Sequence, residues 1–216
     1  YILKSKTPGI SGNDQARQFE AAWIGRDFTI GGSYHESQKN FNPEVGFLAR
    51  EGGYRRPEFY ASRRYRPDNF IGIHELRPHI MWRGFYSPDG FFESGKLHVD
   101  NHWEWRNGYE LHTGINFLHE GVKKSFEIFP GVEVPPGIYN DKEALLEFWS
   151  NQGSWLSAKF SARAGGYYGG DQVQLSPTLK MRYGETFNTE LSWVRSKINL
   201  STGDFVANLG RLRISY

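Results

Sequence analysis

Several long stretches of the chain alternate between apolar and polar residues. In residues 91–106, Leu97, Val99, Trp103 and Trp105 fall on one side of an extended chain, and polar residues fall on the other side. A period of two is the pattern of a β-strand that has one apolar face. Residues 109–120 repeat it, as do segments after residues 155, 171, 186 and 210. The pattern therefore predicts an all-β, antiparallel protein.

The dipeptide Asn107-Gly108 lies between two of these segments and is a strong hairpin signal. A two-residue turn would pair Trp105 with Glu110 and mix apolar and charged residues on one face. A three-residue connection, 106–108 with Gly108 in the left-handed region, keeps one apolar face. The register predicted from this connection pairs Trp105 with Leu111, Trp103 with Thr113, Asn101 with Ile115 and Val99 with Phe117.

The alternating runs are about 10–14 residues long, whereas strands of globular proteins are about 5–6 residues long. About ten tilted residues cross a bilayer, and aromatic residues then gather at its two interfaces. Short connections at 106–108, 169–172 and 184–186 contrast with long ones at 121–152 and 195–205, as in transmembrane barrels. The lipid-facing aromatic girdle predicted on this basis is Trp103, Trp105, Tyr109, Phe117, Phe160, Tyr168, Tyr183, Phe187 and Trp193.

The predicted fold is an antiparallel transmembrane β-barrel, complete or partial, with long extramembrane loops. A soluble β-sandwich or a lipocalin-like barrel also alternates and stays open as the alternative. Asn101 falls on the proposed lipid face, and Pro78 and Pro177 fall within strands, where we expect bulges or strand breaks. Residues 36–70 mix Arg with aromatic residues and three prolines, which predicts an irregular loop or a plug of the lumen.

Composition removes several classes of protein. The 26 Lys and Arg against 24 Asp and Glu give a net charge of +2, which does not indicate a polyanion-binding protein. Because cysteine is absent, disulfides, thiolate metal sites and cysteine nucleophiles are excluded. No apolar run reaches the 18 or so residues of a membrane helix. The Arg-rich segment lacks a recognised nucleic-acid module, so no nucleic-acid partner is expected.

The residues that could bind a metal or line a lumen lie on the polar faces of the predicted strands. Imidazole and carboxylate groups alternate along residues 98–102, and His112 lies on the next strand, so His98, His102 and His112 are a weak metal candidate. Residues two apart on a strand are about 6.5–7 Å apart, which is wide for one ion. The alternative is a wet lumen wall, and no cofactor is expected. The predicted lumen-lining residues are His98, Asp100, His102, Glu104, Glu110, His112, Lys159, Arg163, Lys180, Arg182, Glu190, Arg211 and Arg213.

No catalytic residue is assigned, because no G-x-S-x-G elbow occurs and Glu104 and Glu110 flank a hairpin tip. Acidic groups concentrate at residues 98–120 and basic groups at 159–213. If the sheet curls, these two walls would face each other across water and set an ion preference.

Four stretches resemble a family of large bacterial outer-membrane barrels of unknown function. They are NFNPEVGFLAR (40–50), FPGVEVPPGIY (129–139), GGYYGGDQVQLSPTLKMRYG (165–184) and INLSTGDFVANLGRLRISY (198–216). In that family the barrel follows an N-terminal carbohydrate-binding, family-nine-like domain. The resemblance implies that residues 1–216 are an outer-membrane barrel domain or a fragment of one, in a Gram-negative outer membrane and in contact with its lipid.

The resemblance also implies a porin-like channel or barrel platform linked to glycan or oligosaccharide binding or uptake. Two alternatives stay open. One is a scaffold subunit that binds other outer-membrane subunits, and the other is a carbohydrate- or lipid-active barrel enzyme.

Overall fold

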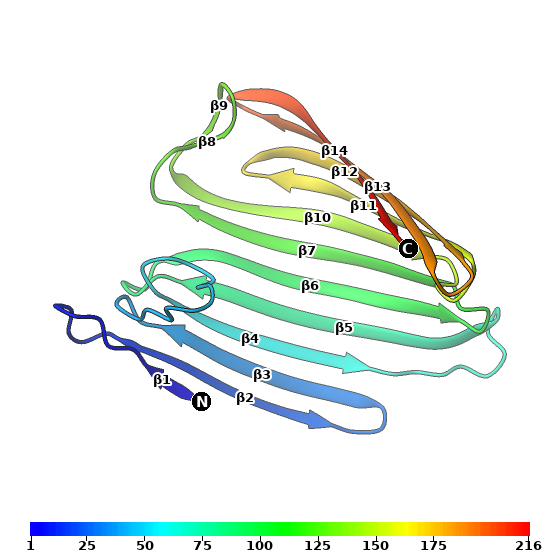
Figure 1. Cartoon of the computed structure of the whole chain (residues 1–216), viewed down its shortest axis with the longest axis horizontal. Helices are drawn as coiled ribbons and strands as arrows, with labels where there is room; N and C mark the ends of the chain where they lie inside the picture. The colour runs from blue at the N-terminus through cyan, green and yellow to red at the C-terminus, as the bar shows by residue number, and fades with distance from the viewer.

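The computed structural model describes residues 1–216 and consists of β-strands joined by turns and loops (Figure 1). It has no helix, and hence no helix that is long and apolar enough to cross a membrane. The fourteen strands are β1 (Ile2–Lys4), β2 (Gln15–Ile24), β3 (Phe28–Ser37), β4 (Tyr54–Arg63), β5 (Ile73–Tyr86), β6 (Phe92–Trp105), β7 (Glu110–Val122), β8 (Phe126–Phe129), β9 (Val132–Val134), β10 (Gly137–Trp149), β11 (Leu156–Tyr167), β12 (Gly170–Tyr183), β13 (Phe187–Leu200) and β14 (Gly203–Ser215).

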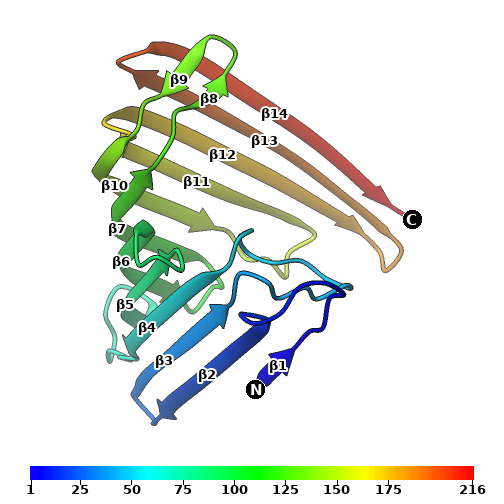
Figure 2. The ribbon, with the colours of Figure 1, turned by 90° about the vertical axis from the view of Figure 1, so that its left-hand side faces the viewer.

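Twelve of these strands form one antiparallel sheet in which chain neighbours are sheet neighbours, and β8 and β9 form a separate ribbon between β7 and β10. The all-β antiparallel prediction is therefore confirmed. The sheet is open, because its edge strands β1 and β14 do not pair with each other, and Figure 2 shows it curving between these edges. This chain by itself does not form a complete barrel.

The β6–β7 hairpin has the predicted connection, and Gly108 has a φ of 83°. Its register differs from the prediction by two residues. Trp103 pairs with Leu111 and Val99 pairs with Ile115, while the backbone of Trp105 bonds to that of Tyr109. A three-residue loop brings together the two residues that flank it, so Trp105 cannot reach Leu111. A shift of two leaves each side chain on its predicted face.

Three predicted loops contain regular strands instead. The segment 36–70 contains β4, whose Pro57 pairs with Tyr34, so only 38–53 and 64–72 are loops there. The span 121–152 contains the β8–β9 ribbon and β10, and the span 195–205 contains the end of β13, a two-residue turn and the start of β14. The predicted contrast between a short-turn rim and a long-loop rim is also wrong. The two-residue turn after Tyr167 lies at the same rim as the long 38–53 loop.

The two strand prolines do not have the effect we expected. Pro78 pairs with Asn101 and Pro177 with Phe160, each within a continuous register. The two register shifts of β5 and β6 lie elsewhere, between Ile73 and Glu75 and between Phe85 and Tyr86. Proline lacks an N–H donor, and the pairing of β12 with β13 is interrupted at Ser176 and Pro177 but resumes at Thr178 in the same register.

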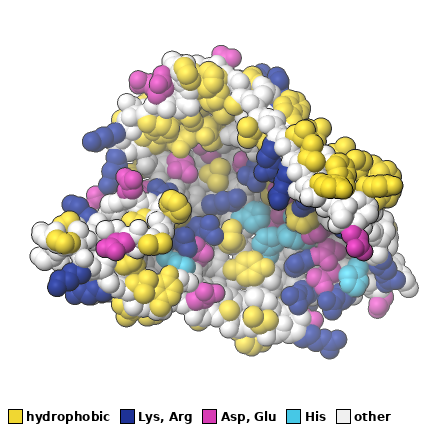
Figure 3. Space-filling view, in the orientation of Figure 1, with side chains coloured by type: hydrophobic (Ala, Val, Ile, Leu, Met, Phe, Trp, Pro, Cys, Tyr) yellow, Lys and Arg dark blue, Asp and Glu magenta, His cyan; other side chains and the backbone are white.

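The two faces of the sheet differ sharply in composition and exposure. Register places the apolar rows of neighbouring strands side by side, so that Val99, Ile115, Leu146 and Leu175 share one face and are all exposed. The polar face contains His98, Asp100, His112, Asn116 and Ser157, which are all buried. In a single-layer sheet, side chains shield one another on the inner side of the curve. Figure 3 shows this side as a hollow with histidine and charged groups at its centre.

One small hydrophobic cluster occurs at a rim of the hollow. Val132 of the β8–β9 ribbon packs against Ile198 of β13 and Phe205 of β14. The rings of Phe129 and Phe205 stack at 4.5 Å, and Thr202 Oγ1 donates a hydrogen bond to the carbonyl of Glu133 at 2.5 Å. The ribbon therefore folds over the polar face where β13 turns into β14, and it covers the apolar residues Ile198 and Phe205 of that face.

We predict that Gly170→Ala destabilises the sheet, because a Cβ at Gly170 would lie 2.1 Å from the backbone oxygen of Asn199 on β13. That oxygen belongs to the strand ladder and cannot move freely, so a loss of about 1–3 kcal/mol is expected. Gly210→Ala is the matched control, because no atom lies within 4 Å of its added Cβ. Chemical unfolding followed by circular dichroism measures both. Equal midpoints for the two variants would contradict the predicted close approach of the strands.

Candidate functional site

The predicted lumen-lining residues share the polar face of the sheet. The register pairs His102 with His112, Glu104 with Glu110 and Lys180 with Glu190, each across neighbouring strands. By alternation along the strands, the rest of the set also faces the hollow: His98, Asp100, Lys159, Arg163, Arg182, Arg211 and Arg213. The sequence pattern thus identified the polar surfaces of β6 and β7 and of β11–β14, which β10 joins in the sheet.

The predicted lipid-facing aromatics share the apolar face with one exception. Trp103, Trp105, Tyr109, Phe117, Phe160, Tyr183, Phe187 and Trp193 occupy positions of that face. Tyr168 does not, because it lies in the turn after β11 with a φ of 49°, which ends the alternation. Its ring contacts Phe126, Tyr139 and Tyr167 under the β8–β9 ribbon. The prediction for Tyr168 was therefore wrong.

Four histidines and two carboxylates gather at the centre of the polar face, and we call them the histidine cluster: His79, His98, Asp100, His102, Glu110 and His112. They come from β5, β6 and β7, which are adjacent in the sheet. The ring of His79 lies 5.0 Å from those of His98 and His102, and His102 stacks on His112 at 3.6 Å. Direct cross-strand pairing of His79 with Asp100 and of His102 with His112 causes this convergence.

A chain of hydrogen bonds orients one end of the cluster. Asn116, fully buried on β7, donates from Nδ2 to Glu143 Oε1 at 2.7 Å, and its Oδ1 faces His98 Nδ1 at 2.6 Å. His98 Nδ1 therefore carries a proton. The other ring nitrogen of His98 lies 3.4 Å from Asp100 Oδ2. Buried polar groups need such partners, and the chain from Glu143 to Asp100 satisfies most of them.

The other end of the cluster is organised around Glu110. Its Oε1 lies 2.7 Å from His112 Nε2 and 3.4 Å from His102 Nδ1. The second nitrogen of His112 lies 3.9 Å from Glu147, which also contacts Arg163 at 3.8 Å. Within the histidine cluster, two buried atoms have no hydrogen-bond partner, Asp100 Oδ1 and His102 Nδ1.

Ion pairs surround the cluster on the same face. Arg77 bridges Glu75 and Glu104, and Glu58 binds Arg56 and Arg83 at 2.7 and 2.9 Å. Carboxylates partly neutralise the predicted basic wall: Glu147 of the neighbouring β10 contacts Arg163, and Glu190 of β13 contacts Lys180 and Arg211. Lys159 lies over the Trp149 ring at 4.3 Å.

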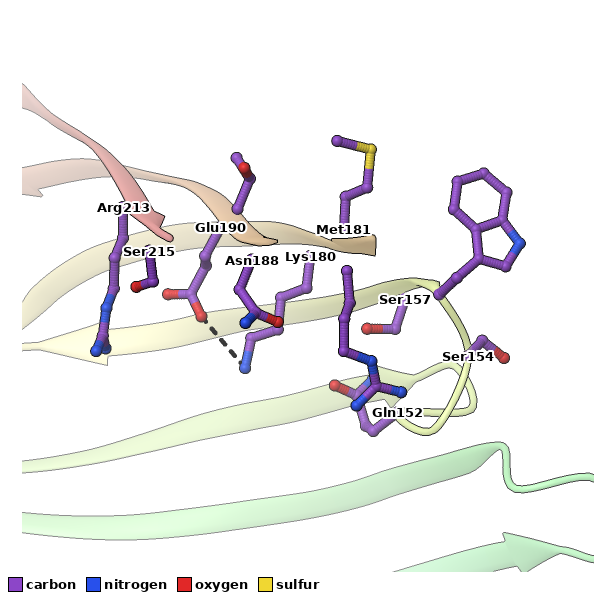
Figure 4. Close-up of a pocket in the computed structure, with 12 residues that line it drawn as sticks. Gln152, Ser154, Ser157, Lys180, Met181, Asn188, Glu190, Arg213 and Ser215 are labelled. Atoms are coloured by element: carbon purple, nitrogen blue, oxygen red, sulfur yellow. Dashed lines mark ion pairs between the residues drawn. The ribbon is translucent and has the colours of Figure 1, made fainter. Parts of the chain in front are cut away.

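A second polar hollow of about 300 Å³ lies between the ends of β12, β13 and β14. Figure 4 shows Lys180, Glu190 and Arg213 pointing into it, whereas Met181 points to the opposite side of the sheet. Lys180 Nζ and Glu190 Oε2 lie 3.2 Å apart, and Arg182 Nη2 donates to the carbonyl of Gly153 at 2.8 Å. The lining is mostly polar, so the hollow suits water and hydrophilic solutes.

Titratable groups at the rim, outside the long strands, also interact with one another. Hydrogen bonds from Lys123, at 2.8 Å, and from Ser87 hold the pKa of Asp89 well below its usual range. Burial under the ribbon, together with the nearby Glu120, raises the pKa of Tyr168 to about 12. The Asp89–Lys123 pair joins the β5–β6 turn to the segment that leads into β8.

The metal candidate from sequence named His98, His102 and His112, and the structure groups the ligands differently. Two sets bring one ligand atom per residue to within 4.8 Å of one another: His79, Asp100 and His102, and His102, Glu110 and His112. His98 is in neither set. Sequence reasoning missed His79, although it placed the adjacent Pro78 within a strand, and it missed Asn116, Glu143 and Glu147 as partners. The alternation of residues 73–86 would have placed His79 on the polar face.

Comparison with protein-family models, with curated proteins and with solved structures finds no match.

We predict that Asn116→Leu destabilises the protein by about 2 kcal/mol or more, because it leaves Nδ1 of the buried His98 and Oε1 of the half-buried Glu143 without their partner. Asn208→Leu on β14 is the matched control, since Asn208 is exposed and should tolerate the same change within about 0.5 kcal/mol. Chemical unfolding followed by tryptophan fluorescence compares them. A smaller loss for Asn116→Leu than for Asn208→Leu would contradict the hydrogen-bond chain.

Proposed function

We propose that this chain forms part of the wall of an outer-membrane β-barrel, with its apolar face against lipid and its polar face lining a water-filled lumen. The observation that carries the proposal is the direction of curvature. In a soluble barrel of the lipocalin type, apolar side chains fill the inner side of the curve. Here the inner side holds buried His98, Asp100 and Asn116, and the outer side holds exposed Val99, Ile115 and others.

The apolar rows of the outer face form a continuous surface that is too large to be left exposed to water. Large exposed apolar patches on soluble proteins are rare, and here the apolar rows run across neighbouring strands from β2 to β14. Trp23 is 61% exposed, Leu179 47% and Leu212 61%, although they lie on three strands spread across the sheet. A hydrocarbon environment would cover all of them without a second protein layer.

The height of the apolar band also fits a bilayer. On β12 the apolar row runs from Val173 to Tyr183, ten residue steps. At about 3.3 Å per residue this is roughly 33 Å along the strand. Strands of membrane barrels tilt by about 35–45°, which gives a height of roughly 23–27 Å, against about 25 Å for the apolar band of known barrels. On β13 the same face carries Lys197 and Arg195, which pair with Val173 and Leu175, so this end of the apolar row on β12 lies at the surface of the bilayer.

The proposal requires that the two sheet edges be paired in the membrane, because unpaired backbone groups are costly in lipid. β14 presents 13 residues at its free edge, and β1 covers only three residues of β2. Further strands, of the same protein or of another subunit, would complete the barrel. Such a barrel would be larger than twelve strands and would keep an aqueous lumen.

Within this class the chain fits a channel or barrel platform. The polar hollow offers fixed charges of both signs and hydrogen-bonding groups, which suit hydrated solutes and ions. The link to glycans or oligosaccharides rests on the sequence resemblance to barrels that follow a carbohydrate-binding domain. A scaffold subunit of a larger complex is the second candidate, favoured by the long free edge of β14.

We predict that Leu179→Arg destabilises the protein in lipid vesicles by about 2–4 kcal/mol, because a charge near the middle of the apolar row would enter hydrocarbon. Thr178→Arg, the adjacent residue on the polar face, should change stability by less than about 1 kcal/mol. Urea unfolding from vesicles measures both. If Thr178→Arg were the more harmful substitution, the assignment of faces would be inverted.

A second prediction concerns conduction by the protein extracted with all its native strands. Arg213 faces the polar hollow without a carboxylate partner, whereas Arg195 lies on the other face at the end of the apolar band. In planar bilayers, Arg213→Gln should shift the reversal potential in a salt gradient toward cation preference, and Arg195→Gln should leave it unchanged. Equal shifts for both variants would contradict a lumen on the polar face. Conductance absent from the native protein would favour the scaffold candidate.

A further inference from the structure

We propose that His79, Asp100 and His102 form a binding site for a divalent transition-metal ion of the zinc class. The three residues lie on the two adjacent strands β5 and β6, and His79 pairs directly opposite Asp100. One ligand atom from each comes within 4.8 Å of the other two. This inference concerns a site on the polar face and does not rest on the presence of a membrane.

The geometry is close to that of a bound ion. Metal–nitrogen and metal–oxygen distances of about 2.0–2.1 Å place tetrahedral ligand atoms about 3.4 Å apart. The set would therefore contract by at most about 1.4 Å for any pair, which rotations of two imidazole rings can supply. Asp100 and His102 are two residues apart on β6, but their ligand atoms lie within 4.8 Å of each other and of the ligand atom of His79 on the neighbouring strand. Three protein ligands leave a fourth position for water or for a solute.

An unpartnered buried carboxylate oxygen points to a missing partner. The Asp100 side chain is only 2% exposed, and its Oδ1 has no hydrogen bond. Its other oxygen contacts only His98, at 3.4 Å. A carboxylate buried in this way is costly unless it is paired or coordinates a metal. His102 Nδ1 also lacks a hydrogen-bond partner.

The surroundings of Asp100 resemble the outer shell of a metal site. Metal ligands are generally held by further hydrogen bonds that fix their orientation. Here the chain from Glu143 through Asn116 to His98 ends on Asp100 Oδ2 and leaves Oδ1 free to coordinate. Asn116 is fully buried, so this chain is rigid. The chain positions Asp100 and supplies no ligand itself.

The donor set favours zinc-like ions over calcium or magnesium, because imidazole suits Zn²⁺, Cu²⁺ and Ni²⁺, whereas Ca²⁺ and Mg²⁺ prefer oxygen ligands. The neighbouring set of His102, Glu110 and His112 is less suitable. Its carboxylate already accepts a hydrogen bond from His112 at 2.7 Å, so both groups have a partner without a metal.

The test uses the protein folded in detergent, freed of metal with a chelator and titrated with ZnCl₂ by calorimetry. We expect one Zn²⁺ per chain in the unmodified protein and a more than tenfold weaker affinity in His79→Gln and in Asp100→Asn. The matched control His35→Gln should bind like the unmodified protein, and His112→Gln, which removes the ring stacked on His102, should weaken binding less than the loss of either ligand does. His35 also faces the hollow, but it lies on β3 and contacts Ser33 at 3.2 Å.

Circular dichroism checks that each variant is folded. X-ray absorption of the zinc-loaded unmodified protein provides a readout that needs no variant, and it should report two imidazole ligands together with oxygen ligands. Failure of the unmodified protein to bind Zn²⁺ would overturn the proposal. Binding that survives His79→Gln but is lost in His112→Gln would overturn it in favour of the neighbouring set.

Discussion

A single-layer sheet has no interior, so its stability depends on what covers its apolar face. Twelve antiparallel strands here form one curved layer, and only a small cluster beneath the β8–β9 ribbon buries hydrophobic side chains against each other. The hydrophobic effect stabilises most domains by enclosing such side chains. In this chain the apolar rows of β2–β14 remain on the outer side of the curve, and that stabilisation has to come from the surroundings. The membrane proposal follows from this constraint.

The inner face is governed by the opposite requirement. Curvature brings polar side chains of neighbouring strands into contact, and once buried they need partners. Asn116 links Glu143 to His98, Glu110 joins two histidines, and Glu190 holds Lys180 and Arg211. The same cross-strand pairing places His79 opposite Asp100, where one carboxylate oxygen remains without a partner. The candidate metal site is therefore a local consequence of the way the polar face is built.

Local pattern was sufficient to predict β6, β7 and β11–β14 and the composition of their two faces, because alternation is a property of consecutive residues. It placed Val99 and His98 on opposite faces, and it placed the turn at Gly108 correctly. Partners across strands were harder, because register depends on geometry between distant segments. The β6–β7 pairing was predicted two residues off, β4 and β10 were taken for loops, and His79 was overlooked beside Pro78. Alternation also does not predict whether the two edge strands pair with each other, and here they do not.

The most direct test of the account is the accessibility of β12 to water, residue by residue. Because the chain contains no cysteine, single cysteines at each position from 173 to 182 can be labelled without background. In lipid vesicles, a membrane-impermeant maleimide added from both sides should label the even positions, which face the lumen, and spare the odd positions, which face lipid. Equal labelling of both sets, or labelling of the odd set alone, would contradict a sheet that has one face in lipid and one in water.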